Sequence, residues 1–288
     1  MANKGGVTAK ILLAEGTARL RAAGISEAGL NCAWLLAYVL GDDRLSLLAD
    51  GARPVPPRAA GNFKKLLARK ARGEPLAYIL GWQPFCGLSL KVDRRVLVPR
   101  PETEELVGLA ADFILKNHKN GAPEILDFGA GSGAIALALA FRFPKASVTA
   151  AEKSKDALAC AKENAAAHGL ESRVRFLRAA SLKGAKGLFD VIVSNPPYIP
   201  TTVIPGLDKE ALSEPFLALD GGADGLKVVR PIIRQAPEAL KKGGALFLEL
   251  GDAQAPQAFK LFNGRFWREK KLFSDLNGKK RFMRAVKK

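Results

Sequence analysis

The sequence predicts an α/β protein with a mostly parallel sheet, preceded by a small helical bundle. From residue 124 onward, short apolar runs rich in β-branched residues alternate with helical stretches. This alternation is typical of a parallel sheet with helices on both faces. Before residue 73, apolar residues recur at helical spacing instead. A chain of 288 residues is long enough for one sizeable domain and a smaller one.

Residues 1–73 are predicted to form the helical bundle. A first amphipathic helix ends near Gly24, Ser26 is a candidate N-cap for a second helix through residues 33–40, and a third helix covers residues 62–72. This segment contains no pattern of catalytic side chains, so we expect it to serve in substrate docking or packing.

Residues 74–98 are predicted to be a β-hairpin linker, with short strands at 76–81 and 88–92. Residues 99–288 form the predicted α/β domain. Its start has two prolines that favour an extended backbone, followed by carboxylates in the first turn of a helix. Arg100, just before that helix, is either structural or faces a cofactor pocket.

Five runs predict the strands of the α/β domain: 124–128, 147–151, 174–177, 189–194 and 245–250. A glycine-rich loop follows the first of them, in the order Gly129, Ala130, Gly131, Ser132, Gly133. Glycines at this position let the backbone approach a ligand closely and open a helix whose N-terminus faces it. The spacing is neither the dinucleotide-binding fingerprint nor a P-loop, which disfavours phosphate binding.

Glu152 ends the second predicted strand, about twenty positions beyond the glycines, where an acidic residue can accept hydrogen bonds from ribose hydroxyls. The alternative is an ordinary surface glutamate.

Asn195, Pro196, Pro197 and Tyr198 follow the fourth predicted strand. The prolines stiffen the backbone, so the Asn195 side-chain carbonyl and the Pro196 backbone carbonyl are fixed acceptors, and Tyr198 offers a flat face. This arrangement suits a planar –NH2 group, although the same letters also occur in simple turns. Together with the glycine loop and Glu152, the motif predicts a nucleoside-bearing cofactor beside a bound –NH2 group.

The formal net charge of +17 is the unusual feature of the composition. Residues 264–288 contain ten Lys or Arg against two acidic residues. A basic surface favours polyanionic partners such as nucleic acid or a ribonucleoprotein, and the alternative is a merely solvated surface.

Cysteine and histidine usage indicates a cytoplasmic protein with no metal site. Three widely separated cysteines do not form a disulfide framework, and two histidines without a Cys-x-x-Cys motif offer no metal-ligand pattern: Cys32, Cys86, Cys160, His118 and His168. The sequence has no apolar N-terminal segment or run of membrane-spanning length, so no membrane association is expected.

The chain resembles class I S-adenosylmethionine-dependent methyltransferases, and more closely the HemK-type protein-(glutamine-N5) methyltransferases of peptide chain release factors. The resemblance covers nearly the whole chain. It is carried by the motifs at residues 73–81, 96–104, 195–198, 214–226 and 248–251. It implies a Rossmann-like class I methyltransferase sheet with helices on both faces, joined by the hairpin to the N-terminal bundle.

The resemblance also implies the substrate, the cofactor and the roles of the site residues. The substrate is the glutamine of the Gly-Gly-Gln motif in class 1 release factors, free or on the ribosome, and the cofactor is S-adenosyl-L-methionine. The loop from Gly129 to Gly133 lines the methionine portion and Glu152 holds the ribose. Asn195 to Tyr198 form the catalytic and substrate-binding motif, and Asn195 is also counted among the cofactor-binding residues. Phe85 of the hairpin is a wall of the substrate pocket.

One position departs from the family's pattern. After the third strand the family usually has an acidic residue for the adenine amino group, but this chain has Ala179 and Ala180 there. Alanine side chains cannot accept a hydrogen bond, so backbone groups or Ser181 take over that contact.

Three alternatives share some of these features. An adenine-N6 methyltransferase also binds a planar –NH2 group, but no separate target-reading domain is evident. A glutamine methyltransferase acting on a ribosomal protein suits the basic C-terminal segment. A non-catalytic RNA-binding protein on the same fold is disfavoured by the intact Asn-Pro-Pro-Tyr motif. Nucleic-acid contact is compatible with the basic surface but is not required by the expected chemistry.

Overall fold

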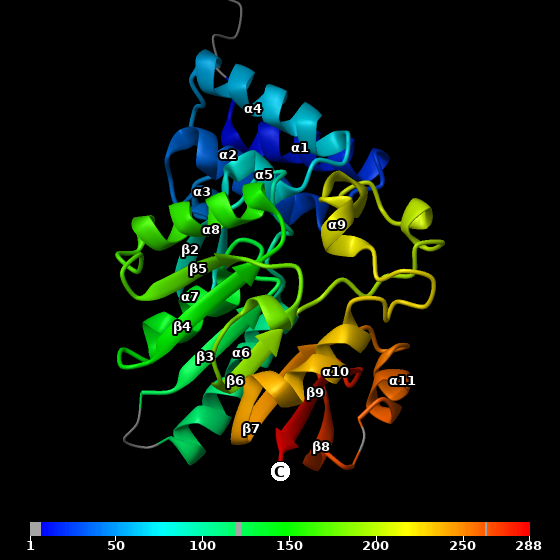
Figure 1. Cartoon of the computed structure of the whole chain (residues 1–288). Coiled ribbons are helices and arrows are strands. Elements are labelled where there is room, and N and C mark those ends of the chain that lie inside the picture. Colours follow the sequence, from blue (N-terminus) through cyan, green and yellow to red (C-terminus); the bar gives the residue numbers. More distant parts are fainter. Residues whose placement is uncertain (1–6, 119–121, 263) are drawn as a thin grey trace, which may run out of the picture. The chain divides into compact units, whose positions relative to one another are not determined.

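The computed structural model describes residues 7–118, 122–262 and 264–288 (Figure 1). The chain divides into two compact units. The helical unit contains the chain through Gly81 together with the segment Asp208–Ser213. The α/β unit contains Trp82–Leu207 and Glu214–Lys288.

The helical unit confirms the predicted helices in outline and adds two short ones. Its helices are α1 (Ala9–Ala22), α2 (Ala28–Leu40), α3 (Arg44–Ala49), α4 (Pro57–Ala71) and α5 (Leu76–Leu80). The apolar stripes of the longer helices meet in a core that includes Leu12, Leu20, Leu35, Leu36 and Phe63.

Two local predictions for the helical unit were wrong. The run at 76–81 is helix α5 rather than a strand, because Pro75 precedes its first turn and Gly81 ends it in the left-handed conformation, with φ 84°. A buried apolar run of this length suits either structure, so its periodicity did not decide. The residue before α2 is Glu27, at φ 49° and without a side-chain cap, and not Ser26.

The segment Asp208–Ser213 is built into the helical unit although it follows the Asn-Pro-Pro-Tyr motif in sequence. The Lys70 side chain is 1% exposed, and its Nζ lies 2.5 Å from Glu210 Oε2. The Ser213 hydroxyl donates to the Gly73 carbonyl at 3.2 Å. The helical unit therefore depends on residues from two distant parts of the chain.

The α/β unit begins with a two-stranded antiparallel hairpin of β1 (Trp82–Phe85) and β2 (Leu88–Lys91). A hairpin is present and its second strand, predicted at 88–92, is confirmed. The predicted first strand was wrong, because β1 is formed by residues that the sequence analysis placed between the two strands. Asn164, which is 0% exposed, holds the end of β2: its Oδ1 accepts from Lys91 N at 2.6 Å and its Nδ2 donates to Lys91 O at 3.0 Å. The same Nδ2 donates to Ser132 O in the glycine loop at 2.9 Å.

The main sheet has the order β5-β4-β3-β6-β7-β9-β8, parallel from β5 to β7 and antiparallel at β9 and β8. Its strands are β3 (Glu124–Phe128), β4 (Ser147–Glu152), β5 (Val174–Arg178), β6 (Phe189–Ser194), β7 (Leu240–Glu249), β8 (Trp267–Ser274) and β9 (Lys280–Lys287). All five predicted strands are confirmed to within a few residues, except that β7 starts earlier.

Helices cover both faces of this sheet (Figure 1). The helices of the α/β unit are α6 (Pro101–Asn117), α7 (Ala134–Arg142), α8 (Lys155–Ala167), α9 (Phe216–Leu219), α10 (Val229–Ala239) and α11 (Ala255–Lys260). One hydrophobic cluster joins α6 and α7 to the sheet, and a second joins α10 and α11 to its other face. The predicted fold class is confirmed.

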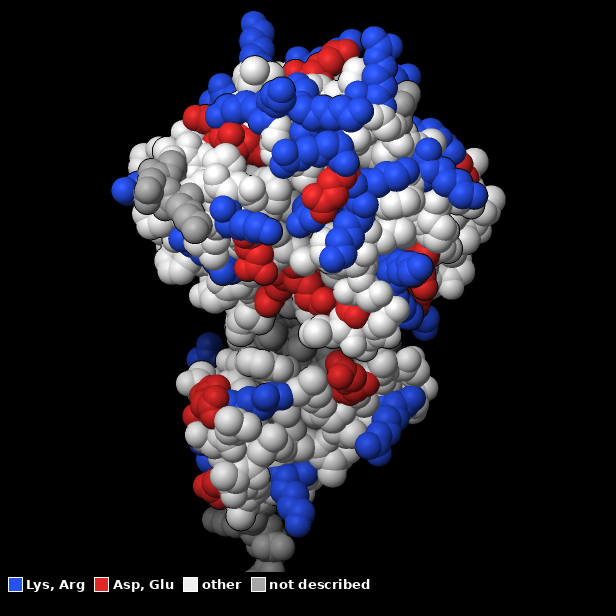
Figure 2. Space-filling view, turned by 90° about the horizontal axis from the view of Figure 1, so that it is seen from below, with Lys and Arg blue, Asp and Glu red and all other residues white. Residues whose placement is uncertain are grey.

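The basic C-terminal segment forms two strands that the sequence analysis did not predict. Most side chains of β8 point to solvent, so its charges do not disturb the core. Arg281 pairs with Asp275 at 2.8 Å and Arg284 pairs with Glu269, which shows that part of the basic excess is locally compensated. Figure 2 shows Lys and Arg side chains spread over one face of the molecule, with fewer Asp and Glu between them.

We predict that Asn164→Leu lowers the free energy of unfolding by about 3 kcal/mol, because it leaves Lys91 N and the buried Ser132 carbonyl without their partner. Urea unfolding followed by circular dichroism measures the change. Asn117→Ala is the matched control, since this exposed asparagine donates only to the Phe113 carbonyl of its own helix. Equal stability of the two variants would contradict the prediction.

Candidate active site

The glycine loop leaves β3 with its glycines in the left-handed region that favours glycine. Gly129, Gly131 and Gly133 have φ of 82°, 55° and 84°. The loop leads directly into α7, whose first N–H groups lack intrahelical partners. The main chain therefore exposes polar backbone to a ligand without side chains in the way.

Glu152 closes the loop from the side of β4. Its Oε2 accepts from Gly131 N at 2.9 Å and its Oε1 accepts from Ser154 N at 2.8 Å. Each carboxylate oxygen can accept more than one hydrogen bond. The side chain is thus fixed by two backbone groups and still has acceptor capacity for a pair of hydroxyls.

The strand order places the glycine loop beside the Asn-Pro-Pro-Tyr motif. β3 is paired in parallel with β4 on one side and with β6 on the other, and Asp127 is opposite Val193. The Ser194 hydroxyl, which is fully buried, donates to the Phe128 carbonyl at 2.5 Å and ties the two strand ends together. The chain reverses its direction of sheet growth between β3 and β6, which is where open α/β sheets bind ligands.

The Asn195 side chain is held by its nitrogen. Its Nδ2 donates to Thr103 Oγ1 at 3.0 Å, and the Thr103 hydroxyl donates to Glu249 Oε2 at 2.7 Å. Among the hydrogen bonds between described residues, none engages Asn195 Oδ1 or the Pro196 carbonyl. These are the two acceptors that the sequence indicated for a planar –NH2 group.

Thr103 and Glu249 were missed as functional residues by the sequence analysis, in which they were only letters of family motifs. Thr103 lies in the first turn of α6 and is 4% exposed, and Glu249 ends β7 and is 1% exposed. The signal that could have found Glu249 is an acidic residue at the end of an otherwise apolar buried strand. Burial raises the pKa of Glu249 to about 7, against the opposing effects of the Thr103 hydrogen bond, the Arg281 charge and the Asn195 amide, which also donates toward this carboxylate.

Tyr198 is half-buried and packs against a glycine-rich turn. A Cβ on Gly221 would lie 2.7 Å from the Tyr198 carbonyl carbon, and one on Gly225 would collide with the Tyr198 carbonyl oxygen. Gly251 approaches the ring itself. Burial raises the pKa of Tyr198 to about 12, so this phenol stays neutral at physiological pH. These contacts explain why the segment after β6 needs glycine at these positions.

Arg100 makes a structural ion pair, the first of the two roles that the sequence left open. Its guanidinium lies 2.6 Å from Glu214 Oε2, and Val98 N donates to the other oxygen of Glu214 at 2.9 Å. The Glu214 side chain is 1% exposed. This buried carboxylate therefore anchors the extended stretch that precedes α6.

Asp127, in β3, is a further acidic residue at this end of the sheet. It is 0% exposed, and its Oδ2 accepts from Ala136 N at 3.0 Å. Its Oδ1 is a buried oxygen without a partner among the described residues. Burial raises its pKa to about 7. An orphaned carboxylate oxygen beside the glycine loop is an acceptor of the kind that a ligand's ammonium group satisfies.

The remaining predicted site residues differ in their solvent exposure. Ser181 follows β5 and is half-buried, and its hydroxyl makes no hydrogen bond to another described residue. Ala179 is buried, and its N–H donates to the Glu152 carbonyl. Phe85 is 1% exposed within the hydrophobic cluster of α6 and α7, a position that favours packing over substrate contact.

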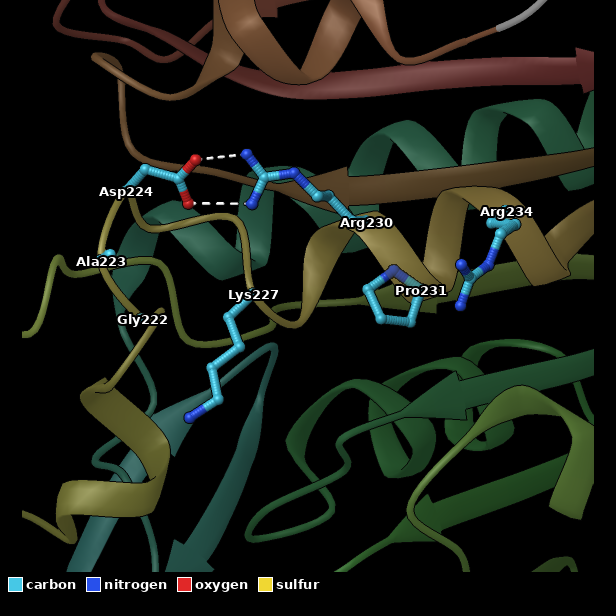
Figure 3. A pocket seen from close by; sticks show the side chains of 7 residues that line it. All are labelled: Gly222, Ala223, Asp224, Lys227, Arg230, Pro231 and Arg234. Carbon is cyan, nitrogen blue, oxygen red and sulfur yellow. Dashed lines mark hydrogen bonds and ion pairs between the residues drawn. The ribbon is translucent and has the colours of Figure 1, made fainter.

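A surface hollow of about 580 Å³ lies elsewhere on the α/β unit (Figure 3). Its lining residues are Gly222, Ala223, Asp224, Lys227, Arg230, Pro231 and Arg234. Asp224 faces Arg230 in an ion pair, and Lys227 pairs with Asp220. Two of its three cations are paired in this way, and none of the strand-end motifs lines it, so we do not take the hollow as the candidate active site.

The described part of the chain contains no cluster of three or more His, Cys, Asp or Glu side chains placed to hold a metal ion. Burial raises the pKa of each thiol, at Cys32, Cys86 and Cys160, to about 11, so none is set up as a nucleophile. No helix in the described ranges has both the length and the hydrophobicity to cross a membrane.

The sheet order and the strand-end site define a Rossmann-like α/β fold, which solved methyltransferase structures share. The hMettl16 catalytic domain in complex with MAT2A 3'UTR hairpin 6 superposes with a TM-score of 0.57 at 17% identity, over 77% of this chain and 81% of that one. A T. thermophilus 16S rRNA methyltransferase in complex with AdoMet and guanosine superposes with a TM-score of 0.53 at 21% identity, over 72% and 50% of the two chains. Similarity at this level of identity shows the fold.

Sequence relatives then identify the family. The profile of the PrmC N-terminal domain matches residues 12–81, and that of the methyltransferase small domain matches residues 105–204. The release factor glutamine methyltransferase of Deinococcus radiodurans is 41% identical over 95% of this chain and 96% of its own. That of Geobacter sulfurreducens is 43% identical over 83% of both chains. The chain belongs to the release factor glutamine methyltransferase family and is a methyltransferase.

We predict that Gly225→Ala is far more damaging than Gly243→Ala. Both glycines have φ 77°, so both substitutions carry the same left-handed strain of about 1 kcal/mol. Only the Gly225 Cβ would displace Tyr198, since nothing lies within 4 Å of a Cβ at Gly243. Methyl transfer should therefore fall at least about tenfold in Gly225→Ala alone. The pair is compared by urea unfolding and by initial rates, and similar rates for the two variants would refute the assignment.

Proposed function

We propose that this protein transfers a methyl group from S-adenosyl-L-methionine to the side-chain amide nitrogen, N5, of the glutamine in the Gly-Gly-Gln motif of class 1 release factors. The observation that carries the proposal is the Asn195 side chain. Its nitrogen is bound within the protein, and its oxygen, together with the Pro196 carbonyl, is left to accept the two N–H bonds of a planar amide. The relatives named above supply the substrate.

The residues present fit the proposed cofactor. Backbone of the glycine loop faces the ligand side, and the orphaned Asp127 oxygen suits its ammonium group. The spare acceptor capacity of Glu152 suits the ribose hydroxyls. Ser181 and nearby backbone groups are left for the adenine, in place of the acidic residue that the family usually has after the third strand. When bound, the cofactor supplies an electrophilic methyl group on a sulfonium sulfur.

The protein's contribution to the reaction is positioning and electrostatics. An amide nitrogen is a weak nucleophile because its lone pair is delocalised into the carbonyl. The Asn195 and Pro196 carbonyls draw the two N–H bonds toward them, which orients the nitrogen and favours its partial pyramidalisation, and Tyr198 packs on the amide plane. Positive charge that develops on the nitrogen is stabilised by these fixed carbonyl dipoles. No general base is needed before transfer, because the nitrogen attacks with its lone pair and loses one of its two protons to solvent only afterwards, which restores a neutral amide.

The remaining parts of the proposal concern partners and cellular location. The helical unit is proposed to dock the release factor, free or on the ribosome, in the cytoplasm. The basic surface is compatible with contacts to ribosomal RNA that hold the enzyme near its substrate (Figure 2). Residues 74–98 remain a proposed linker. The substrate-pocket role predicted for Phe85 is not proposed further, because this side chain is 1% exposed within the hydrophobic core.

Labelling with radioactive S-adenosylmethionine tests the proposal against its rivals. The acceptors are a class 1 release factor, the same factor with its Gly-Gly-Gln glutamine changed to alanine, a mixture of ribosomal proteins, and an adenine-rich DNA duplex. We expect label on the intact factor alone. Label on ribosomal protein or on DNA would replace the proposed substrate, and label on the alanine-substituted factor would refute the assigned glutamine.

We predict that Asn195→Ala lowers kcat by about 100-fold or more, because it removes one of the two acceptors that act in the transition state. Cofactor Kd, measured by isothermal titration calorimetry, should change by less than about threefold, since the glycine loop and Glu152 are untouched. The control is Asn277→Ala, a change in the turn between β8 and β9. An unchanged kcat in Asn195→Ala would exclude the proposed role.

A further inference from the structure

The proposed reaction depends on which end of the Asn195 amide faces the substrate. An oxygen facing the glutamine –NH2 accepts a hydrogen bond from it. If the Asn195 nitrogen lay there instead, its N–H groups would face the N–H groups of the substrate, and donors cannot hydrogen-bond to donors. The two ends of a primary amide have nearly the same shape, so packing alone does not choose between them.

A buried hydrogen-bond chain makes this choice in the structure. Asn195 Nδ2 donates to Thr103 Oγ1, and the Thr103 hydroxyl donates to Glu249 Oε2. The three residues come from the end of β6, the first turn of α6 and the end of β7. β6 and β7 are adjacent and parallel, with Ser194 opposite Leu248, so Asn195 and Glu249 occupy equivalent positions on neighbouring strands.

The ionised carboxylate sets the direction of the whole chain. A carboxylate only accepts hydrogen bonds, so the single hydroxyl proton of Thr103 is committed to Glu249. The Thr103 oxygen is then an acceptor toward Asn195, and it binds the amide through its nitrogen. Asn195 Oδ1 is consequently the end that remains for the substrate.

We propose that Thr103 and Glu249 are positioning residues that hold the Asn195 amide with its oxygen toward the substrate amide. The inference rests on the proposed function and deepens it, because it assigns the orientation of the acceptor to two residues that do not touch the substrate.

The burial of Glu249 supports this role over a purely structural one. Glu249 is 1% exposed and makes no ion pair among the described residues. A buried acidic group without a salt-bridge partner is unfavourable for folding, and such groups cluster at functional sites. A glutamine or an apolar residue would fill the same space at lower cost in stability.

Protonation of Glu249 removes the constraint. A neutral carboxyl can donate to Thr103, whose hydroxyl is then free to donate to Asn195 Oδ1, with the amide reversed. The charged and titratable groups around Glu249 are Arg281 on β9, which favours the carboxylate, Glu102 on α6, which opposes it, and Tyr198. Burial raises the Glu249 pKa to about 7, so the carboxyl is half protonated near that pH. The ordered chain is therefore present above this pH and lost below it.

The test compares Thr103→Val with Thr103→Ser. Valine has the shape of threonine without the hydroxyl, whereas serine keeps the hydroxyl. We expect Thr103→Val to lower kcat on the release factor by about tenfold or more, with cofactor Kd and release-factor KM within about twofold of wild type. Thr103→Ser should retain kcat to within about threefold. Equal losses in both variants, or a loss that appears in cofactor Kd instead of kcat, would overturn the proposal.

Glu249→Gln tests the dependence on charge. Wild-type kcat is expected to rise with pH between about pH 6 and about pH 9 with a midpoint near the Glu249 pKa, and the variant profile should be lower and flat.

The effect of Glu249 ionisation on stability has the opposite sign to its effect on kcat. A raised carboxyl pKa gives stability that is present below the unfolded value and lost as pH rises through the folded value. At pH above 7 the variant should thus unfold at the same or a higher urea concentration than wild type. A loss of activity with retained stability excludes a merely structural role, and an unchanged pH profile would refute the inference.

A substrate-free measurement separates this inference from the proposed function. In protein labelled with isotopic asparagine, the side-chain amide resonances of Asn195, identified by their absence in Asn195→Ala, should titrate with the Glu249 carboxyl. They should lose that titration in Thr103→Val and in Glu249→Gln. Asn195 amide chemical shifts that do not change with pH or with either substitution would overturn the positioning role. Wild-type protein that shows this titration but does not label the release factor would refute the proposed substrate alone.

Discussion

Parallel pairing of β3 with β6 is the constraint on which the rest of the site depends. It brings the glycine loop and the Asn-Pro-Pro-Tyr motif to neighbouring strand ends, although some sixty residues of sequence lie between them. The buried hydrogen bond from Ser194 to Phe128 fixes the two strand ends at the point where they leave the sheet. A slip of the register by one residue would turn Asn195 to the other face, because successive side chains of a strand alternate.

Several residues that take no part in the proposed reaction hold the site residues in place. Glu214 anchors the chain before α6, and α6 in turn supplies Thr103. The glycine turn at 221–225 packs on the backbone of Tyr198. Asn164 links the hairpin to the glycine loop from α8. Rigid surroundings of this kind suit a reaction whose rate depends on the orientation of a weak nucleophile.

The sequence predicted the fold and the strand-end motifs well, because these depend on local patterns. Apolar runs mark buried strands, and glycine and proline restrict the backbone wherever they occur. The buried chain that holds Asn195 was not predictable, since Thr103 and Glu249 are distant in sequence and acquire their relation only when α6 packs beside β6 and β7. The residues proposed to contact the substrate and the cofactor could be predicted from the sequence, whereas the residues that orient them could not.

The errors have physical causes of the same kind. Helix α5 and a strand are equally consistent with five apolar residues between proline and glycine. The strand β8 was hidden by its charges, which face solvent at the edge of the sheet and so produce no apolar run. β9 lies inside the sheet, and Arg284 divides its buried apolar residues into two pairs too short to predict a strand. Acidic partners such as Asp275 and Glu269 lie outside the strand that carries each arginine, and their pairing became apparent only in three dimensions.

The composition of the helical unit has a consequence for how such a protein can change over generations. Because that unit includes Asp208–Ser213 as well as the N-terminal helices, it is not a cassette that a single crossover in the gene could exchange. A recombinant that kept Lys70 but replaced the later segment would hold a buried ammonium group without Glu210 as its counter-charge. The N-terminal helices and the segment that follows the Asn-Pro-Pro-Tyr motif must therefore come from the same parent gene for the helical unit to fold correctly.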